Sequence, residues 1–119
     1  MNPTRKARSV SRAATKKLRH WVVEISRPNV SRVYGEIVCN LGETRTEEIF
    51  NNGSTIVVRT RDYLIDVLDW PFDSEPAVDD VIKDADGVFK ITDESGEGAW
   101  RWSGRDRATY RIHTVESER

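Results

Sequence analysis

The side chains that could take part in chemistry are few and widely spaced. The chain has two histidines, His20 and His113, and one cysteine, Cys39. Their spacing matches no usual zinc site. A catalytic triad would need one of the histidines as its base, but the alternation of Tyr110–Thr114 places His113 on the same strand face as Arg111. We therefore expect His113 at the surface or at a subunit interface, and we expect no metal site and no enzyme activity.

Three acidic or glycine-containing stretches could also bind a ligand. Asp84–Gly87 shares its Asp and Gly residues with a calcium loop but lacks the third ligand and the Glu at position twelve, so we expect a tight turn. Gly96–Gly98 is short and acidic, and no helix follows it to receive a phosphate. Asp79 and Asp80 are adjacent, and we expect them to be solvated loop charges. The sequence predicts no cofactor and no small-molecule substrate.

The stretch from residue 100 to residue 114 has the pattern of a hairpin. Trp100 and Trp102 are two residues apart and therefore point to the same side of a strand, where a core or a partner protein can cover them. Arginines alternate with these tryptophans and with Tyr110, so a stacking platform for single-stranded nucleic acid is a second interpretation. We favour the first, in which the tryptophans close the core; the arginines are Arg101, Arg105, Arg107 and Arg111.

Short apolar and β-branched runs separated by turn residues fill the chain from residue 20 onward. These runs predict seven or eight strands at a spacing of about 8 to 12 residues, which is typical of an antiparallel sandwich or small barrel. Asn51–Ser54 is a strong hairpin signal because Asn and Gly tolerate positive φ. Asp69–Asp79 is acidic and contains two prolines, so we expect an exposed loop. The apolar runs lie at 20–25, 33–40, 47–50, 55–60, 63–68, 81–82 and 88–92, and the hairpin of residues 100–114 follows them.

The charge is distributed unevenly along the chain. The 119 residues include 19 Lys and Arg and 20 Asp and Glu, but the first 20 residues contain seven of the bases and no acid. An arm with a charge of +7 therefore precedes a body with a net charge near −8. A molecule with this uneven charge could bind two different partners, or its own neighbours head to tail. Residues 4–19 suit either an amphipathic helix or a basic arm that orders on binding. The seven cations are Arg5, Lys6, Arg8, Arg12, Lys16, Lys17 and Arg19.

These features define the expected organisation of the chain. We expect a mainly β protein, a small antiparallel β-barrel or sandwich at 20–116, with a basic N-terminal helix or arm at 1–19 and a tail at 117–119. No apolar run reaches the ~20 residues that a membrane helix needs, and no secretory signal is present. The single Cys39 lies in an apolar stretch, so we expect a buried, inert thiol and a reducing compartment.

Four short strings occur in an order that resembles a family of small tailed-phage proteins. They are Arg59–Ile65, Val78–Ile82, Trp100–Ser103 and Arg111–Thr114, and the resemblance spans about residues 31 to 115, most of the body. The chain resembles head-completion proteins, the adaptors or stoppers that join head to tail. The residues assigned to the barrel or to the family motif are Arg61, Asp62, Tyr63, Leu64, Ile65, Trp100, Trp102, Tyr110, Arg111 and His113.

This resemblance implies a structural role. The family assembles as a homo-oligomeric ring, with the portal or an adaptor ring above it, a tail protein below it, and double-stranded DNA in its channel without sequence specificity. It implies a virion protein of the head–tail interface, made in the cytoplasm of the bacterial host, that helps to close the DNA channel. The basic arm would meet an acidic neighbour or DNA. The alternative function is a small β-barrel nucleic-acid-binding module.

Overall fold

The computed structural model describes residues 21–93, 96 and 98–117, and every regular element in these residues is a strand. The predicted helix at 4–19 and the seven cations of the arm lie outside the described residues. No helix in the described part of the chain is long and apolar enough to span a membrane. The strands are β1 (Trp21–Ser26), β2 (Tyr34–Asn51), β3 (Ser54–Asp66), β4 (Val81–Lys83), β5 (Val88–Ile91), β6 (Trp100–Trp102) and β7 (Thr109–Glu116).

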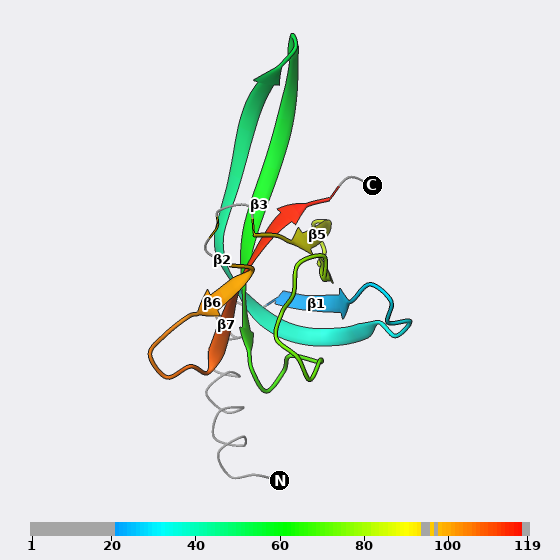
Figure 1. Ribbon diagram of the computed structural model, residues 1–119, viewed down its shortest axis with the longest axis vertical. Coiled ribbons are helices and arrows are strands. Elements are labelled where there is room, and N and C mark those ends of the chain that lie inside the picture. Colours follow the sequence, from blue (N-terminus) through cyan, green and yellow to red (C-terminus); the bar gives the residue numbers. More distant parts are fainter. Residues whose placement is uncertain (1–20, 94–95, 97, 118–119) are drawn as a thin grey trace.

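Six of these strands close into an antiparallel barrel (Figure 1). The order is β3-β2-β1-β4-β5-β7, and β7 pairs back with β3. β6 lies outside this circuit and pairs with the first half of β7, while β5 pairs with its second half. The predicted mainly β fold is confirmed, and it takes the form of the barrel rather than the sandwich.

The core lies inside the barrel and follows the period-two alternation of its strands. Most inward positions are β-branched or aromatic, which suits the pleated surface and removes apolar area from water. Tyr63 and Phe89 are fully buried and meet edge to face, with ring centroids 5.9 Å apart. The buried apolar residues of the strands are Val23, Ile25, Ile37, Cys39, Tyr63, Ile65, Ile82, Phe89, Ile91, Tyr110 and Ile112.

β2 and β3 are each longer than the sequence predicts. The turn signals at Leu41–Gly42 and Arg61–Asp62 predict a break in each strand, but both strands continue through these residues. The reason is a bulge. Gly42 and Glu43 together lie opposite Asp62, between the pairs Leu41↔Tyr63 and Thr44↔Arg61. An extra residue in one strand bends and twists the pair without ending it.

Beyond this bulge, once β3 has parted from β7 at Thr60, the two strands leave the barrel as a projecting hairpin, which we call the distal hairpin (residues 46–59). Its pairing is unbroken from Thr46↔Arg59 to Asn51↔Ser54. Asn52 and Gly53 form the turn with φ of 51° and 80°, the two positive values of a primed hairpin turn. At about 3.3 Å per residue the arm reaches roughly 20 Å, and in Figure 1 it stands clear of the other strands.

The loop from residue 67 to residue 80 is less exposed than the sequence predicts. Trp70 and Asp80 are buried, and Trp70 Nε1 donates to the Ser74 carbonyl over 2.8 Å. The prediction that Asp80 is a solvated charge is wrong, because Asp80 is 1% exposed and its carboxylate accepts two hydrogen bonds of 2.8 Å from Arg27, which directly follows β1. The Arg27 guanidinium also lies 4.2 Å from the ring centroid of Phe72. This clamp holds the loop against the barrel.

Candidate functional site

A buried charged cluster occupies one end of the barrel. Arg61 Nη1 donates to Asp84 Oδ2 over 2.7 Å, and the Tyr63 hydroxyl donates to the same oxygen over 2.6 Å. Asp84 Oδ1 accepts from the backbone N–H groups of Asp86 and Gly87. The tight turn predicted at Asp84–Gly87 is therefore present. Its first carboxylate fastens the β4–β5 turn to β3.

The surroundings of Asp84 favour its charged form. Burial alone would raise the pKa of this carboxyl, but the hydrogen bonds from Tyr63 and Arg61 outweigh burial and hold the pKa below its usual value. Burial and the neighbouring Asp84 raise the pKa of Tyr63. The Arg61 guanidinium also faces the rings of Trp21 and Phe89, at 5.4 and 4.8 Å from their centroids. Every group in this cluster has a partner, so its role is to hold the barrel together.

A second charged cluster lies on the outer face, at the base of the distal hairpin. Asp62 accepts from Arg111 Nε and meets His113 Nδ1, both over 2.9 Å. The predicted alternation thus places Arg111 and His113 on one face, and the β3–β7 register brings Asp62 opposite His113. The other ring nitrogen of His113, Nε2, has no hydrogen-bond partner within the described residues. No group of three or more metal-binding side chains occurs in the same part of the chain.

The bulge at Gly42 brings its backbone against this cluster, which gives a testable prediction. A Cβ on Gly42 would lie 3.0 Å from Asp62 Cβ and 3.2 Å from Arg111 Nη2. Because the Cβ of Asp62 is fixed to the backbone of β3 and cannot move aside without it, we expect Gly42→Ala to lower the free energy of unfolding by about 1 to 2 kcal/mol, measured by urea denaturation. Gly35→Ala in the same strand is the control, because its nearest atom would be 3.9 Å away. Equal losses in the two variants would show that the approach at Gly42 is not strained.

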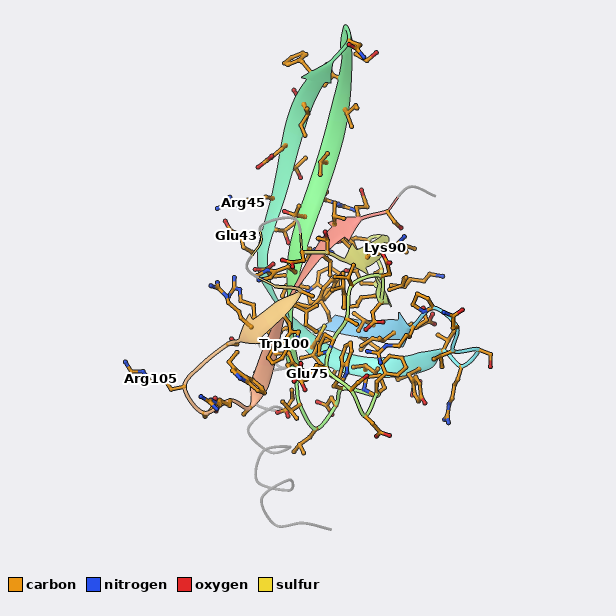
Figure 2. The ribbon with its side chains drawn as sticks, viewed as in Figure 1. Glu43, Arg45, Glu75, Lys90, Trp100 and Arg105 are labelled. Atoms are coloured by element: carbon orange, nitrogen blue, oxygen red, sulfur yellow. The ribbon has the colours of Figure 1, made fainter. Side chains whose placement is uncertain are left out.

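The hairpin of β6 and β7 carries an aromatic group at the open edge of the sheet. Trp102 stacks on Tyr110, with centroids 5.2 Å apart and planes at 14°, and Trp100 meets both rings edge to face. The two tryptophans point to the same side, and both are only half-buried. Arg105 and Arg107 in the connecting loop are exposed, and Figure 2 shows Arg105 projecting away from the barrel.

The structure separates the residues singled out from the sequence into three groups. The first lies inside the barrel, the second on its outer face, and the third at the edge strand. The inner group is Arg61, Tyr63, Ile65 and Tyr110; the outer group is Asp62, Leu64, Arg111 and His113; the edge group is Trp100 and Trp102.

The sequence predicts the turn of the distal hairpin, but it does not predict the length of the arm or the apolar residues on both of its faces. Period-two alternation puts Glu48, Phe50 and Val57 on one face and Glu47, Ile49 and Ile56 on the other. Phe50, Val57, Ile49 and Ile56 are all exposed, and Phe50 is 80% exposed. In Figure 2 the side chains stand free on both sides of the arm. Apolar residues on both faces of an Asn-Gly hairpin are the signal that could have found it.

A closed barrel whose apolar arm has no cover among the residues that the structure describes is typical of a protein that acts by binding other proteins in an assembly, because exposed apolar surfaces mark interaction sites. The family described as phage head-tail joining protein matches residues 1–119, and the chain belongs to this family. No curated protein and no solved structure matches the chain. The family is structural, and it implies a virion component at the head–tail interface that contacts other head and tail proteins.

The single thiol gives a second prediction. Cys39 is 4% exposed, and burial raises its pKa to about 12. Because the thiolate is the reactive form, we expect no reaction of folded protein with an aromatic disulfide reagent at pH 8 and complete reaction in denaturant. The measurement is the absorbance of the released thiol. Rapid labelling of the folded chain would mean that the barrel opens readily between β1 and β2.

Proposed function

We propose that this chain is a ring subunit of a tailed-phage neck, joining the portal side of the head to the tail and helping to close the DNA channel. The observation that carries the proposal is the distal hairpin. Its apolar residues on both faces have no cover within the described residues, although the barrel behind it is closed and complete. A subunit of this shape needs neighbours on more than one side.

Membership of the head-tail joining family supports this role, and the shape of the subunit supports a ring. The distal hairpin and the β6–β7 hairpin are unlike surfaces at different places on one barrel (Figure 1). Contacts between unlike surfaces of identical subunits are heterologous, and they form a ring when the rotation closes. In this proposal the portal or adaptor ring lies above, a tail protein lies below, and double-stranded DNA passes through without sequence-specific contacts.

The uneven charge supports a role for the arm. In the proposed organisation a barrel domain at 20–116 carries the basic arm at 1–19 and a short tail at 117–119. The arm holds seven of the 19 basic residues, and the rest of the chain holds 12 basic and 20 acidic residues. We propose that the arm meets either an acidic neighbouring subunit or DNA, because its cations have no acidic residue near them in sequence.

The test of the ring is the number of copies in purified particles. Quantitative mass spectrometry of gradient-purified phage is expected to find this chain at a fixed ratio to the portal protein, corresponding to one ring per particle. A matched preparation of tailless heads tells whether the chain joins before the tail. Absence of the chain from intact particles would overturn the proposal.

The alternative function, a small nucleic-acid-binding module, makes a different prediction. Isolated subunits would then bind DNA or RNA, with an affinity that falls steeply as salt rises. Comparing the full chain with a chain that lacks residues 1–19 separates the two functions. If the arm serves assembly, its removal blocks incorporation into particles and leaves the barrel folded; if it serves a module, its removal abolishes nucleic-acid binding.

A further inference from the structure

The ring interface can be assigned more closely, on the condition that the proposed ring exists. We propose that the distal hairpin of one copy docks on the β6–β7 hairpin of the next copy, so that Phe50 packs against Trp102 and Glu48 pairs with Arg105 and Arg107. The partner is thus a second copy of this chain, held through two unlike surfaces.

The hairpin surface is both apolar and acidic. Phe50 and Glu48 are two residues apart on β2, and Val57 lies directly across from Glu48 on β3, so all three share one face. Val57 is 60% exposed, and Glu48 makes no recorded ion pair within the described residues. The paired strands present this face with their backbone already ordered, so docking costs less conformational entropy than it would for an unpaired segment. It requires a partner that offers apolar surface beside positive charge.

The β6–β7 hairpin offers this combination. One face of the Trp102 ring stacks on Tyr110, and the side chain remains half-exposed at the open edge of the sheet. Arg105 and Arg107 follow in the same loop, are exposed, and make no recorded ion pair with the residues that the structure describes. Aromatic and arginine residues are the ones that most often dominate binding energy at protein interfaces.

Geometry and charge favour a second copy over other occupants. The tip of the distal hairpin and the loop of Arg105 lie far apart on the molecule, so one chain cannot bring them together (Figure 2). DNA would suit Arg105 and Arg107, but its phosphates would repel Glu48 and would leave Phe50 in water. A second copy satisfies both surfaces at once, and the remaining free surface of each copy repeats the contact around a ring.

Cross-linking within particles tests the contact directly. Thr55 pairs with Phe50 and shares its face, and Ser103 follows Trp102, so Thr55→Cys and Ser103→Cys place thiols on the two surfaces. The double variant, treated with a short bismaleimide in purified particles, is expected to give a ladder of covalent multimers of this chain. Each single variant is expected to give none, and the buried Cys39 adds no background.

The other outcomes each overturn a different statement. Dimers from Thr55→Cys alone would show that hairpins contact each other, and adducts with another particle protein would show a different partner. No cross-link in particles that contain the chain would also overturn the proposed contact. Absence of the chain from particles would instead overturn the ring on which this inference rests.

A charge exchange gives an independent test of the assigned face. Glu48→Arg and the pair Arg105→Glu with Arg107→Glu are each expected to reduce incorporation at least tenfold, and their combination is expected to restore it. Glu47→Arg is the matched control, because it makes the same change on the opposite face of the same arm. Thermal unfolding of each isolated variant checks that the barrel is intact. An equal loss in Glu47→Arg, or no restoration in the combination, would overturn the assignment.

Discussion

Asp84→Asn is expected to lower the free energy of unfolding by about 3 kcal/mol, because it removes the charge that neutralises a buried guanidinium. The Asp84 side chain is 0% exposed and accepts from Arg61, Tyr63 and two backbone N–H groups. Urea denaturation measures the loss. The value lies at the lower end of what broken buried pairs cost, because Asp86 still pairs with Arg61 over 3.1 Å.

Asp86→Asn is the control for this prediction. Its side chain is 41% exposed, so solvent screens its pairing with Arg61, and we expect a loss of less than about 1 kcal/mol. If the two variants lose the same free energy of unfolding, the burial of Asp84 adds nothing to the strength of its pairing with Arg61. In that case the cluster is not what fastens the β4–β5 turn to the barrel.

The contribution of Asp84 to the free energy of unfolding is expected to depend on pH. The pKa of Asp84 is lower in the folded protein than its usual value, so the stability that it contributes is fully present above about pH 4, the unfolded pKa. This stability is lost as the pH falls through the folded pKa, because protonation then favours the unfolded chain. The difference in unfolding free energy between wild type and Asp84→Asn is therefore expected to shrink below pH 4. A difference that stays constant down to pH 2.5 would contradict this.

Shortening the distal hairpin is expected to abolish assembly without unfolding the barrel. The variant lacks Glu47–Phe50 and Thr55–Val58 and keeps the turn at Asn51–Ser54. Because four residues, an even number, are removed from each strand, the remaining residues keep their register and still point to the same faces of the sheet. Because none of the removed residues belongs to the core cluster of the described chain or packs against it, the change in unfolding free energy is expected to stay within about 1 kcal/mol. The titre of infectious particles is expected to fall to background.

A hairpin of full length but polar surface separates reach from apolar contact. Phe50→Thr with Val57→Thr keeps the β-propensity of both positions and removes the two most exposed apolar side chains of the arm. Loss of titre in this variant as well would assign the effect to apolar docking. A wild-type titre from the shortened chain would show that the arm has no part in assembly.

Much of the barrel could be predicted because its information is local. The alternation around Ile112 and the Asn-Gly turn at residues 52 and 53 each act within a few residues. The continuity of β2 and β3 could not be predicted, because a glycine at position 42 signals a turn equally well whether or not the partner strand absorbs it as a bulge. Only the tertiary structure places Asp62 of β3 opposite Gly42 and Glu43.

The candidate sites depended on register and were only partly predictable. Arg111 and His113 could be placed on one face from alternation, but their partner Asp62 follows from the pairing of β3 with β7. The Arg61–Asp84 pair joins residues 23 positions apart, and no spacing rule predicts it. Phe50 could be placed in a strand, but only the bend at the bulge carries it away from the core.

The pairing of β7 has a consequence for how the protein is made. β7 pairs with β3 on one edge and with β5 and β6 on the other, so the barrel cannot close without it. Residues 109–116 leave the ribosome after all the other strands, and until then β3 and β5 present open edges that invite pairing with other chains. A translation product that stops early therefore lacks its closing strand and cannot reach the folded state. In this way the topology itself excludes incomplete chains from the virus particle.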